Sequence, residues 1–343
     1  MQKIGVIGAG KFGLTVSTLI SKNADVLLYT RNAQRAETIN KEHICNNISL
    51  PKNITAVTSL ETLAKECILI LPIVPSLNFR DMMKSISPLL RPEHILIHGT
   101  KGLDIKNRSA EIDYKDNIEL SQIMTMSEVI RDESSVLRVG CLSGPNIATE
   151  ILAGQPTATV VASEYNEVIH LGRKVLESDK FFVFGSNSIK GAEMAGALKN
   201  YIALGAGLLD GHGMGRNMQA LLLTRGLREM IHISKLLGSD VESFLGTAGI
   251  GDLIATSTSR DSRNFLAGVR ISKGETVQEI VDSSDEIAEG IRTLSIANQL
   301  TGKIETTAPI TKLLYSVIFE GFEFNRAITS IMRYPFTPDV DFL

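Results

Sequence analysis

The chain has 343 residues, of which 43% are hydrophobic and 21% charged, and this ordinary composition excludes a disordered or collagen-like protein. Its 35 basic and 38 acidic residues give a net charge of −3, so the chain as a whole carries no signal for binding nucleic acid. Its longest apolar stretch has eight residues, far fewer than the ~20 that cross a membrane, and its start lacks a signal-peptide pattern.

The number and spacing of the cysteines indicate the redox environment of the protein. Cys45, Cys67 and Cys141 are far apart and odd in number, so they predict neither a disulfide framework nor a Cys-x-x-Cys metal site. Such usage suits a reducing environment. We therefore expect a cytoplasmic protein with no bound metal, no membrane span and no nucleic-acid partner.

The first half of the chain alternates short apolar runs with helical stretches such as Leu14–Lys22 and Ala33–Lys41. Continuous apolar runs are typical of strands covered on both faces, and strand–helix alternation predicts a doubly wound parallel sheet of the α/β class. The predicted strands are Lys3–Ile7, Asp25–Tyr29, Ile68–Leu71, Ile95–His98, Arg138–Leu142, Thr157–Ala162 and Phe181–Phe184.

From about Ile189 the sequence instead predicts long helices. Apolar residues recur at helical spacing in Asn217–Leu237, with charged residues such as Arg228 and Glu229 at other positions, and the series Ile287, Ile291, Leu294 and Ala297 forms a second apolar stripe. We place a domain boundary near residue 188, which gives an α/β domain over 1–188 and a helical domain over 189–343. The polar stretch 104–133 is the best candidate for a flexible excursion.

A glycine-rich turn follows the first predicted strand. Gly8, Gly10 and Gly13 form a G-x-G-x-x-G pattern that opens a helix. In a dinucleotide site these glycines permit the tight turn, the approach of the pyrophosphate and the close packing of helix on strand, while the helix N-terminus attracts the phosphates. In this context the pattern favours dinucleotide binding over a turn without a ligand.

The end of the second predicted strand lacks the carboxylate that binds the ribose hydroxyls in a typical NAD site, ~20 residues after the glycines. The chain has Thr30-Arg31-Asn32 there. Arg31 can pair with a 2′-phosphate, which favours NADP(H), although a solvated arginine is nearly as good an interpretation.

Two further turns follow strands at positions where ligands bind in open α/β sheets. Thr100-Lys101-Gly102 offers a lysine, and Ser143-Gly144-Pro145-Asn146 offers backbone N–H groups. Each is also compatible with an ordinary surface turn.

The helical half contains two polar clusters. Lys199 lies among small and apolar residues, where a partly buried lysine can act as an acid or base, or where its stem covers apolar surface. A second glycine-rich turn ends in Asp252, and Ser262-Arg263-Asn264 follows it. Arginine suits phosphate recognition, but a helix connection followed by an N-cap has the same pattern. Glu289 stands near a further helix start.

Together these motifs resemble those of bacterial-type NAD(P)-dependent glycerol-3-phosphate dehydrogenases, in the same order and over nearly the whole chain. The resemblance implies a Rossmann-like N-terminal domain, an all-helical C-terminal domain and an active site in the cleft between them. It implies reversible reduction of dihydroxyacetone phosphate to sn-glycerol 3-phosphate with NADPH or NADH, for glycerophospholipid synthesis. It also suggests a homodimer.

The motif positions assign roles, with Lys199 as proton donor and acceptor. The catalytic set is Lys199, Lys101 and Asp252. The expected cofactor-binding set is Gly8, Gly10, Lys11, Phe12, Gly13, Arg31, Lys101, Ala148, Arg263, Ala288 and Glu289. The expected substrate-binding set is Lys101, Gly144, Asn146, Lys199, Asp252, Ser262, Arg263 and Asn264.

The chain departs from the family at Lys11 and Phe12, where the family usually has a small or polar residue followed by Trp or Tyr. Two other functions fit the same general pattern. One is another two-domain reductase of the β-hydroxyacid or ketopantoate type, which needs a carboxylate pocket instead of a phosphate site. The other is a catalytically silent NADP(H)-binding sensor, which needs the glycine turn alone.

Overall fold

A computed structural model describes residues 3–107, 117–283, 288–304, 307–335 and 339–341. Its contacts divide the chain into two compact units, residues 1–104 with 124–189 and residues 105–123 with 190–343. Within the second unit, the backbone N–H of Ile118 donates to the side chain of Gln299 at 3.0 Å. The expected domains, 1–188 and 189–343, stay a prediction. Part of the stretch 104–133, which we expected to be flexible, forms a regular helix, and its residues 108–116 lie outside the described part.

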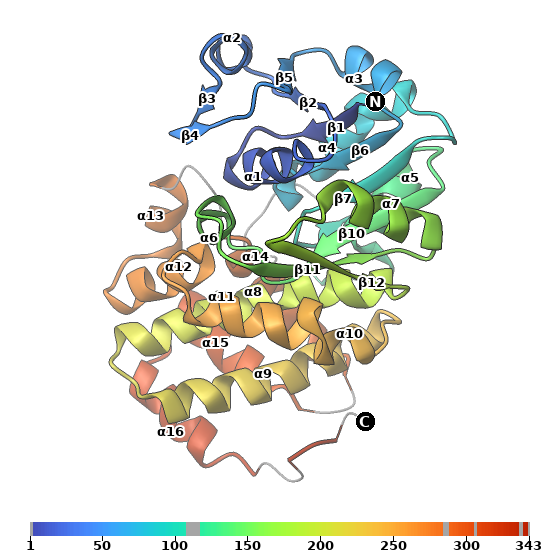
Figure 1. The fold of residues 1–343 in the computed structure, drawn as a ribbon. Coiled ribbons are helices and arrows are strands. Elements are labelled where there is room, and N and C mark those ends of the chain that lie inside the picture. The colour runs from blue at the N-terminus through green and yellow to red at the C-terminus, as the bar shows by residue number, and fades with distance from the viewer. Residues whose placement is uncertain (1–2, 108–116, 284–287, 305–306, 336–338, 342–343) are drawn as a thin grey trace. The chain divides into compact units, whose positions relative to one another are not determined.

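The first unit is built on an eight-stranded sheet with the order β12-β11-β10-β7-β6-β1-β2-β5 (Figure 1). The strands from β5 to β10 in this order are parallel, which confirms the expected α/β class. The strands are Ile4–Ile7 (β1), Val26–Tyr29 (β2), Ile54–Val57 (β5), Leu69–Pro72 (β6), Ile95–His98 (β7), Arg138–Ser143 (β10), Thr157–Ala162 (β11) and Phe181–Ser186 (β12), with short strands Ile44–Cys45 (β3), Ile48–Ser49 (β4), Asp104–Ile105 (β8) and Ile123–Met124 (β9).

The prediction of a wholly parallel sheet is wrong at one edge, because β11 pairs with β10 in the antiparallel sense and β12 then runs parallel to β11. Only the five-residue helix α6 (Ala148–Leu152) lies between β10 and β11. A connection between parallel strands usually carries a longer helix that covers one face of the sheet, and this connection has only the single short helix.

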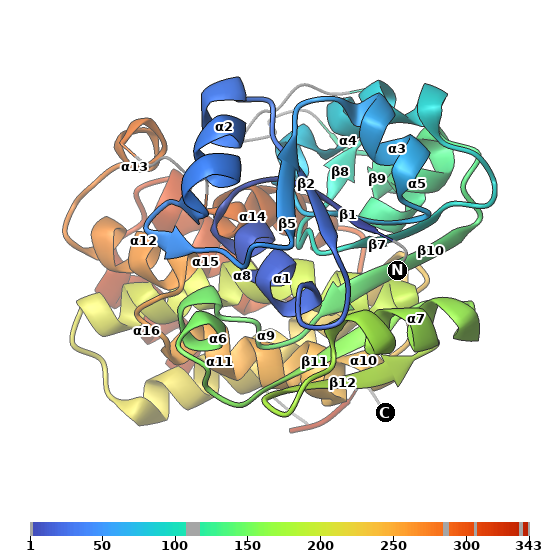
Figure 2. The same cartoon turned by 45° about the horizontal axis from the view of Figure 1, so that its top comes forward.

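Helices cover both faces of the sheet. The helices α1 and α7 pack on each other, while α3, α4 and α5 form a separate layer (Figure 2). The helices of this unit are Lys11–Ile20 (α1), Ala33–Glu42 (α2), Leu60–Glu66 (α3), Ser76–Ile86 (α4), Met126–Glu133 (α5), Ala148–Leu152 (α6) and Asn166–Leu176 (α7), with the 3₁₀ turn Ser87–Leu89 (η1). The 3₁₀ turn Leu120–Gln122 (η2) belongs to the second unit.

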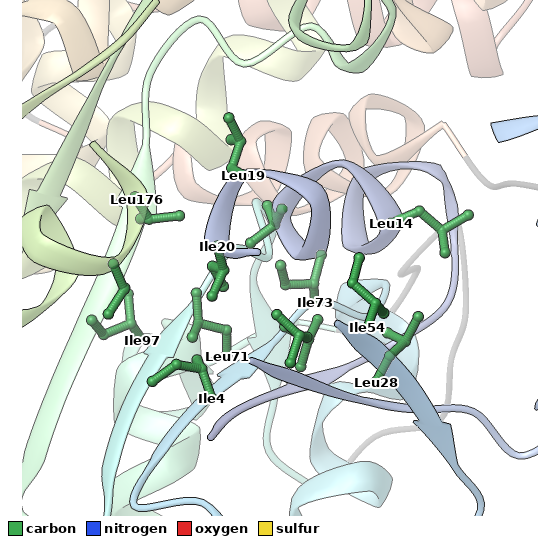
Figure 3. Packing of buried hydrophobic residues seen from close by; sticks show 14 of the residues in the cluster. Ile4, Leu14, Leu19, Ile20, Leu28, Ile54, Leu71, Ile73, Ile97 and Leu176 are labelled. Atoms are coloured by element: carbon green, nitrogen blue, oxygen red, sulfur yellow. The ribbon is translucent and has the colours of Figure 1, made fainter. Parts of the chain in front are cut away.

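Alternate residues of each strand meet a different layer, as the period of two requires. Ile4 and Val6 of β1 join the cluster beneath α1, together with Leu28, Leu71 and others drawn in Figure 3. Gly5 faces the other way, and a Cβ built on it would lie 3.2 Å from Leu63 of α3. Burial on both faces explains why these strands read as continuous apolar runs and could be predicted from the sequence.

The described residues of the second unit are almost entirely helical, as expected. Its helices are Ile189–Gly211 (α8), Arg216–Leu236 (α9), Glu242–Leu245 (α10), Asp252–Thr258 (α11), Arg263–Ser272 (α12), Val277–Asp282 (α13), Glu289–Leu300 (α14), Pro309–Phe319 (α15) and Phe324–Met332 (α16), with one π-helical turn, Thr247–Gly251 (η3). Within the described part of the chain, none of the helices combines the length and apolar character needed to cross a membrane.

The predicted apolar stripes of this unit are buried in α14 and in the C-terminal half of α9, whereas Ala220 of the predicted α9 stripe is exposed and Leu223 is half-buried. Leu227, Met230 and Ile231 of α9 are inside, and so are Ile291, Leu294 and Ala297 of α14, whereas Ile287 lies outside the described residues. Two charged residues of α9 that lie off the apolar stripe are also buried. Arg228 is 9% exposed and Glu229 is 1% exposed, because each finds polar partners on other segments.

Candidate active site

The glycine turn of the first unit has the geometry of a phosphate-binding loop. Gly8 has φ = +117°, and a Cβ on it would lie 2.1 Å from the carbonyl oxygen of Ile73, so only glycine fits there. A Cβ on Gly13 would lie 1.9 Å from the carbonyl oxygen of Gly8. These contacts bring the start of α1 directly against β1.

Helix α1 begins at Lys11, and its N-cap residue, Gly10, makes no side-chain cap hydrogen bond. Gly10 and Lys11 are exposed, while Phe12 is partly buried against the core cluster. The first turn therefore presents backbone N–H groups and the positive end of a ten-residue helix, flanked by a lysine. This cradle fits a dinucleotide pyrophosphate.

Arg31 is exposed directly after β2, next to the start of α2. Asn32 caps this helix by accepting a hydrogen bond from the backbone N–H of Arg35 at 2.9 Å. The first turn of α2 contains no acidic residue. The end of β2 therefore offers cations and a helix N-terminus to an anion, and no carboxylate to ribose hydroxyls.

Two turns of the first unit that we predicted separately are joined by a hydrogen bond. The ammonium of Lys101 donates to the carbonyl oxygen of Gly144 at 2.7 Å. Gly144 has φ = +129° and packs against Thr159. The amide nitrogen of Asn146 donates to the hydroxyl of Thr159 at 2.9 Å, and Oδ1 of Asn146 is a buried acceptor without a hydrogen-bond partner among the described residues. Such an orphaned acceptor is suited to a ligand's donor.

Lys199, Asp252 and Thr256 form a buried polar cluster in the second unit. The ammonium of Lys199 lies 2.6 Å from Oδ1 of Asp252 and also donates to the hydroxyl of Thr256. The Thr256 hydroxyl lies 3.2 Å from the same carboxylate oxygen. Lys199 is 4% exposed and Asp252 is 1% exposed. The buried ammonium and the buried carboxylate therefore lie in direct contact, away from solvent.

Local structure places these groups. The π-helical turn η3 leads directly into α11, whose first residue is Asp252. Gly249 in that turn approaches the backbone of Phe244 so closely that a Cβ would lie 2.3 Å away. Thr256 follows Asp252 by four residues, so the two side chains share one face of α11. The sequence places the Thr256 hydroxyl in the same polar stretch as Asp252, but the site sets that the resemblance implies do not include it, and the spacing of four residues was the signal that could have added it.

A second buried network lies beside the first. The amide of Asn264 donates to Oδ1 of Asn200 at 3.0 Å and accepts from the backbone N–H of Gly290 at 2.8 Å. A Cβ on Gly290 would lie 2.4 Å from the carbonyl oxygen of Asn200, so glycine is required for this approach. The network ties α8, α12 and α14 together next to Lys199.

The other expected residues lie at helix starts. Ser262 caps α12 by accepting from the backbone N–H of Phe265 at 3.2 Å, and Arg263, the first residue of that helix, is exposed. Ala288 is the N-cap of α14, and Glu289 is its first residue. Ala148 begins α6 in the first unit. The structure thus brings together Lys199 with Asp252, Asn264 with Gly290, and Lys101 with Gly144.

Sequence models and relatives in sequence point to the same family. Residues 3–169 match the N-terminal sequence model of NAD-dependent glycerol-3-phosphate dehydrogenase, and residues 188–329 match the C-terminal model. A glycerol-3-phosphate dehydrogenase [NAD(P)+] of Acinetobacter baumannii (strain SDF) is 35% identical over 99% of this chain and 92% of that protein. One from Exiguobacterium sp. is 34% identical over 98% of this chain and 96% of that protein.

Among solved structures, the glycerol-3-phosphate dehydrogenase of Coxiella burnetii superposes with a TM-score of 0.84 at 26% identity, covering 97% of this chain and 99% of that one. The two sequence models together span both units, and the relatives are matched over nearly their full length. The chain belongs to the NAD-dependent glycerol-3-phosphate dehydrogenase family.

Proposed function

We propose that this protein catalyses the reversible reduction of dihydroxyacetone phosphate to sn-glycerol 3-phosphate with NADPH or NADH, for glycerophospholipid synthesis. The observation that carries the proposal is the buried Lys199–Asp252 pair, with a nitrogen–oxygen distance of 2.6 Å, in a chain of this family. A buried ion pair is costly to maintain and gives weak evidence of a stabilising role, whereas a charged acid held in place is useful in catalysis.

The dinucleotide, when bound, supplies a hydride to the carbonyl carbon of the substrate. Gly8, Gly10 and Gly13 with the first turn of α1 would hold its pyrophosphate. Negative charge then develops on the carbonyl oxygen, and the ammonium of Lys199 stabilises that charge and donates the proton. Asp252 holds the ammonium in position and keeps it charged until the proton leaves. The neutral amine recovers a proton from solvent before the next turnover.

The substrate phosphate needs a cation at a distance from the reacting carbon. Arg263 is exposed at the start of α12, between the buried side chains of Ser262 and Asn264, and a guanidinium can grip a phosphate with two hydrogen bonds. A remote grip of this kind also orients the carbonyl. On the same motif grounds, Lys101, Gly144 and Asn146 contribute to substrate binding from the first unit, with Ala148, Ala288 and Glu289 at cofactor contacts.

We further propose a preference for NADP(H) over NAD(H), a cytoplasmic location and a homodimer. Arg31 and the lack of an acidic residue in the first turn of α2 support the cofactor preference. Cys45, Cys67 and Cys141 are buried free thiols, which supports a reducing compartment. Sedimentation of the purified protein tests the homodimer.

The function is tested by following NADPH and NADH absorbance with several carbonyl substrates. We expect rapid oxidation of the cofactor with dihydroxyacetone phosphate, slow oxidation with dihydroxyacetone and none above background with ketopantoate or other 2-keto acids. Faster turnover of a keto acid would instead support the β-hydroxyacid or ketopantoate-type reductase. Tight NADPH binding without turnover of any substrate would support the sensor.

A further inference from the structure

Glu229 is a buried carboxylate that the proposed chemistry does not use. It lies on α9 and is 1% exposed. Its Oε1 accepts from the backbone N–H of Ile310 at 2.8 Å. Its Oε2 accepts from the backbone N–H of Thr311 at 2.8 Å and from the hydroxyl of Thr311 at 2.7 Å. One side chain of α9 therefore satisfies two first-turn donors of α15, together with a hydroxyl.

The hydrogen bonds continue from Thr311 to α8. The hydroxyl oxygens of Thr311 and Tyr201 are 3.2 Å apart. A threonine hydroxyl has one proton, and an ionised carboxylate can only accept. Because the Thr311 proton points at Glu229, the proton between the two hydroxyls must come from Tyr201. The ionised carboxylate thereby sets the direction of the whole chain, from Tyr201 through Thr311 to Glu229.

Tyr201 stands on the helix that carries Lys199. The two residues are two positions apart, which is about 200° around an α-helix, so they project from nearly opposite sides of α8. Tyr201 and Thr311 are both fully buried. The rotation of α8 at this level is thus fixed from one side by Lys199 with Asp252, and from the other by Tyr201 with Thr311.

We propose that Glu229, Thr311 and Tyr201 are positioning residues, which hold α8 so that the ammonium of Lys199 stays at its catalytic position. The proposal rests on the proposed role of Lys199 as proton donor. It assigns a role in the reaction to a carboxylate, a threonine and a tyrosine that touch neither substrate nor cofactor. The need is physical, because much of α8 around Lys199 consists of small apolar residues, which include Ala192, Ala195, Gly196, Ala197 and Ala203 and whose side chains make no hydrogen bonds. The hydrogen bond between Asn200 and Asn264 is a further polar tie of α8 beside Lys199.

Protonation of Glu229 would reorder the chain. Burial raises the pKa of Glu229 to about 7, against the hydrogen bonds from Thr311 and Ile310 and the charge of Arg228, which lower it. Tyr201 faces the carboxylate from α8, and Arg228 on α9 is itself paired with Asp341. A protonated carboxyl would donate to Thr311, so that Tyr201 would lose its acceptor. We therefore expect kcat to fall as the pH drops below about 7.

The test uses Tyr201→Phe, which removes one hydroxyl and keeps the ring, with Thr311→Val as a second break in the same chain. Ser234→Ala is the matched control, because it removes a fully buried hydroxyl of α9 whose hydrogen bond stays within that helix. The measured quantities are kcat and KM for dihydroxyacetone phosphate across pH, and the melting temperature. Displacing a catalytic group by an ångström can cost up to ~100-fold in rate, so a looser helix should cost on the order of tenfold.

We expect both variants to lose about tenfold in kcat relative to Ser234→Ala with KM nearly unchanged, and to lack the fall in kcat below about pH 7 that we expect of wild type. Values of kcat within about twofold of the control would overturn the proposal. If wild type itself shows no turnover, the proposed function is wrong, and the positioning role is then tested by hydrogen exchange of α8 peptides. Faster exchange in Tyr201→Phe than in Ser234→Ala supports the positioning role, and equal exchange overturns it.

Discussion

Replacing Lys199 by methionine should separate the stability of the second unit from its chemistry. Methionine has nearly the length of lysine, so the cavity left behind is small. The change removes the cation that lies 2.6 Å from Oδ1 of Asp252, a carboxylate that is only 1% exposed. Breaking a buried pair by removing one partner typically costs ~3–5 kcal/mol, because the remaining charge stays buried.

The double variant Lys199→Met/Asp252→Leu removes both charges. Replacing a buried ion pair by apolar residues of similar volume is often close to neutral. We therefore expect the double variant to recover most of the lost stability, to within about 2 kcal/mol of wild type. Neither variant has the proton donor, so both should lose about 10²–10⁴-fold in kcat while NADPH binding changes little.

The assay combines urea unfolding followed by circular dichroism with the rate of NADPH oxidation. Lys235→Met is the control, since it makes the same chemical change at an exposed lysine of α9. This control should keep its free energy of unfolding within about 0.5 kcal/mol of wild type and its kcat within about twofold. The reasoning is refuted if Lys199→Met is as stable as the control, or if it retains more than about a tenth of wild-type kcat.

Three further predictions concern single side chains. Arg263→Ala should cost ~2–5 kcal/mol in kcat/KM with dihydroxyacetone phosphate and much less with dihydroxyacetone, and equal losses would assign the residue a structural or cofactor role. Arg31→Ala should raise the Kd of NADPH about ten- to hundredfold and leave that of NADH unchanged. The control Lys41→Ala, at the other end of α2, should change neither Kd. If Arg31→Ala weakens the binding of NADPH and NADH equally, the basis for an NADP(H) preference is lost. The folded-state pKa of Glu229, about 7, exceeds its usual value of 4.5. Glu229 therefore contributes stability that is complete below pH 4.5 and is lost as the pH rises through 7. The free energy of unfolding measured in urea should fall by on the order of 3 kcal/mol across this range. Glu229→Gln should abolish that part of the pH dependence, and an unchanged slope would contradict the assignment.

Sequence patterns predicted the structural elements that are determined by residues close together in the sequence. The glycines of the first turn, the apolar strands and the amphipathic stripes of α9 and α14 each follow from steric limits or periodicity within a few residues. Each predicted strand is present with its ends within two residues of those predicted, for example Ile95–His98 at β7. The strand β5 (Ile54–Val57) was missed, because its alternation of buried and exposed residues is too short to distinguish from a loop.

Properties that depend on distant segments were predicted poorly. The pairing of Lys199 with Asp252 joins residues 53 apart in sequence, and the resemblance to a family, rather than any spacing, suggested that both belong to one site. The burial of Glu229 depends on donors from α15, about 80 residues later, so the helical spacing of α9 contained no sign of it. The antiparallel direction of β11 likewise has no local signal in the sequence, because the connection before it is long enough for either direction.

The most direct test of the central claim follows a label from cofactor to product. Wild-type protein is incubated with dihydroxyacetone phosphate and NADPH carrying deuterium at the transferable position of the nicotinamide, and the product is examined by NMR and mass spectrometry. We predict glycerol 3-phosphate with one deuterium on its C2 carbon and none exchanged with water. Loss of the label to solvent, its appearance elsewhere, or the absence of glycerol 3-phosphate would contradict hydride transfer to a phosphorylated triose by this protein.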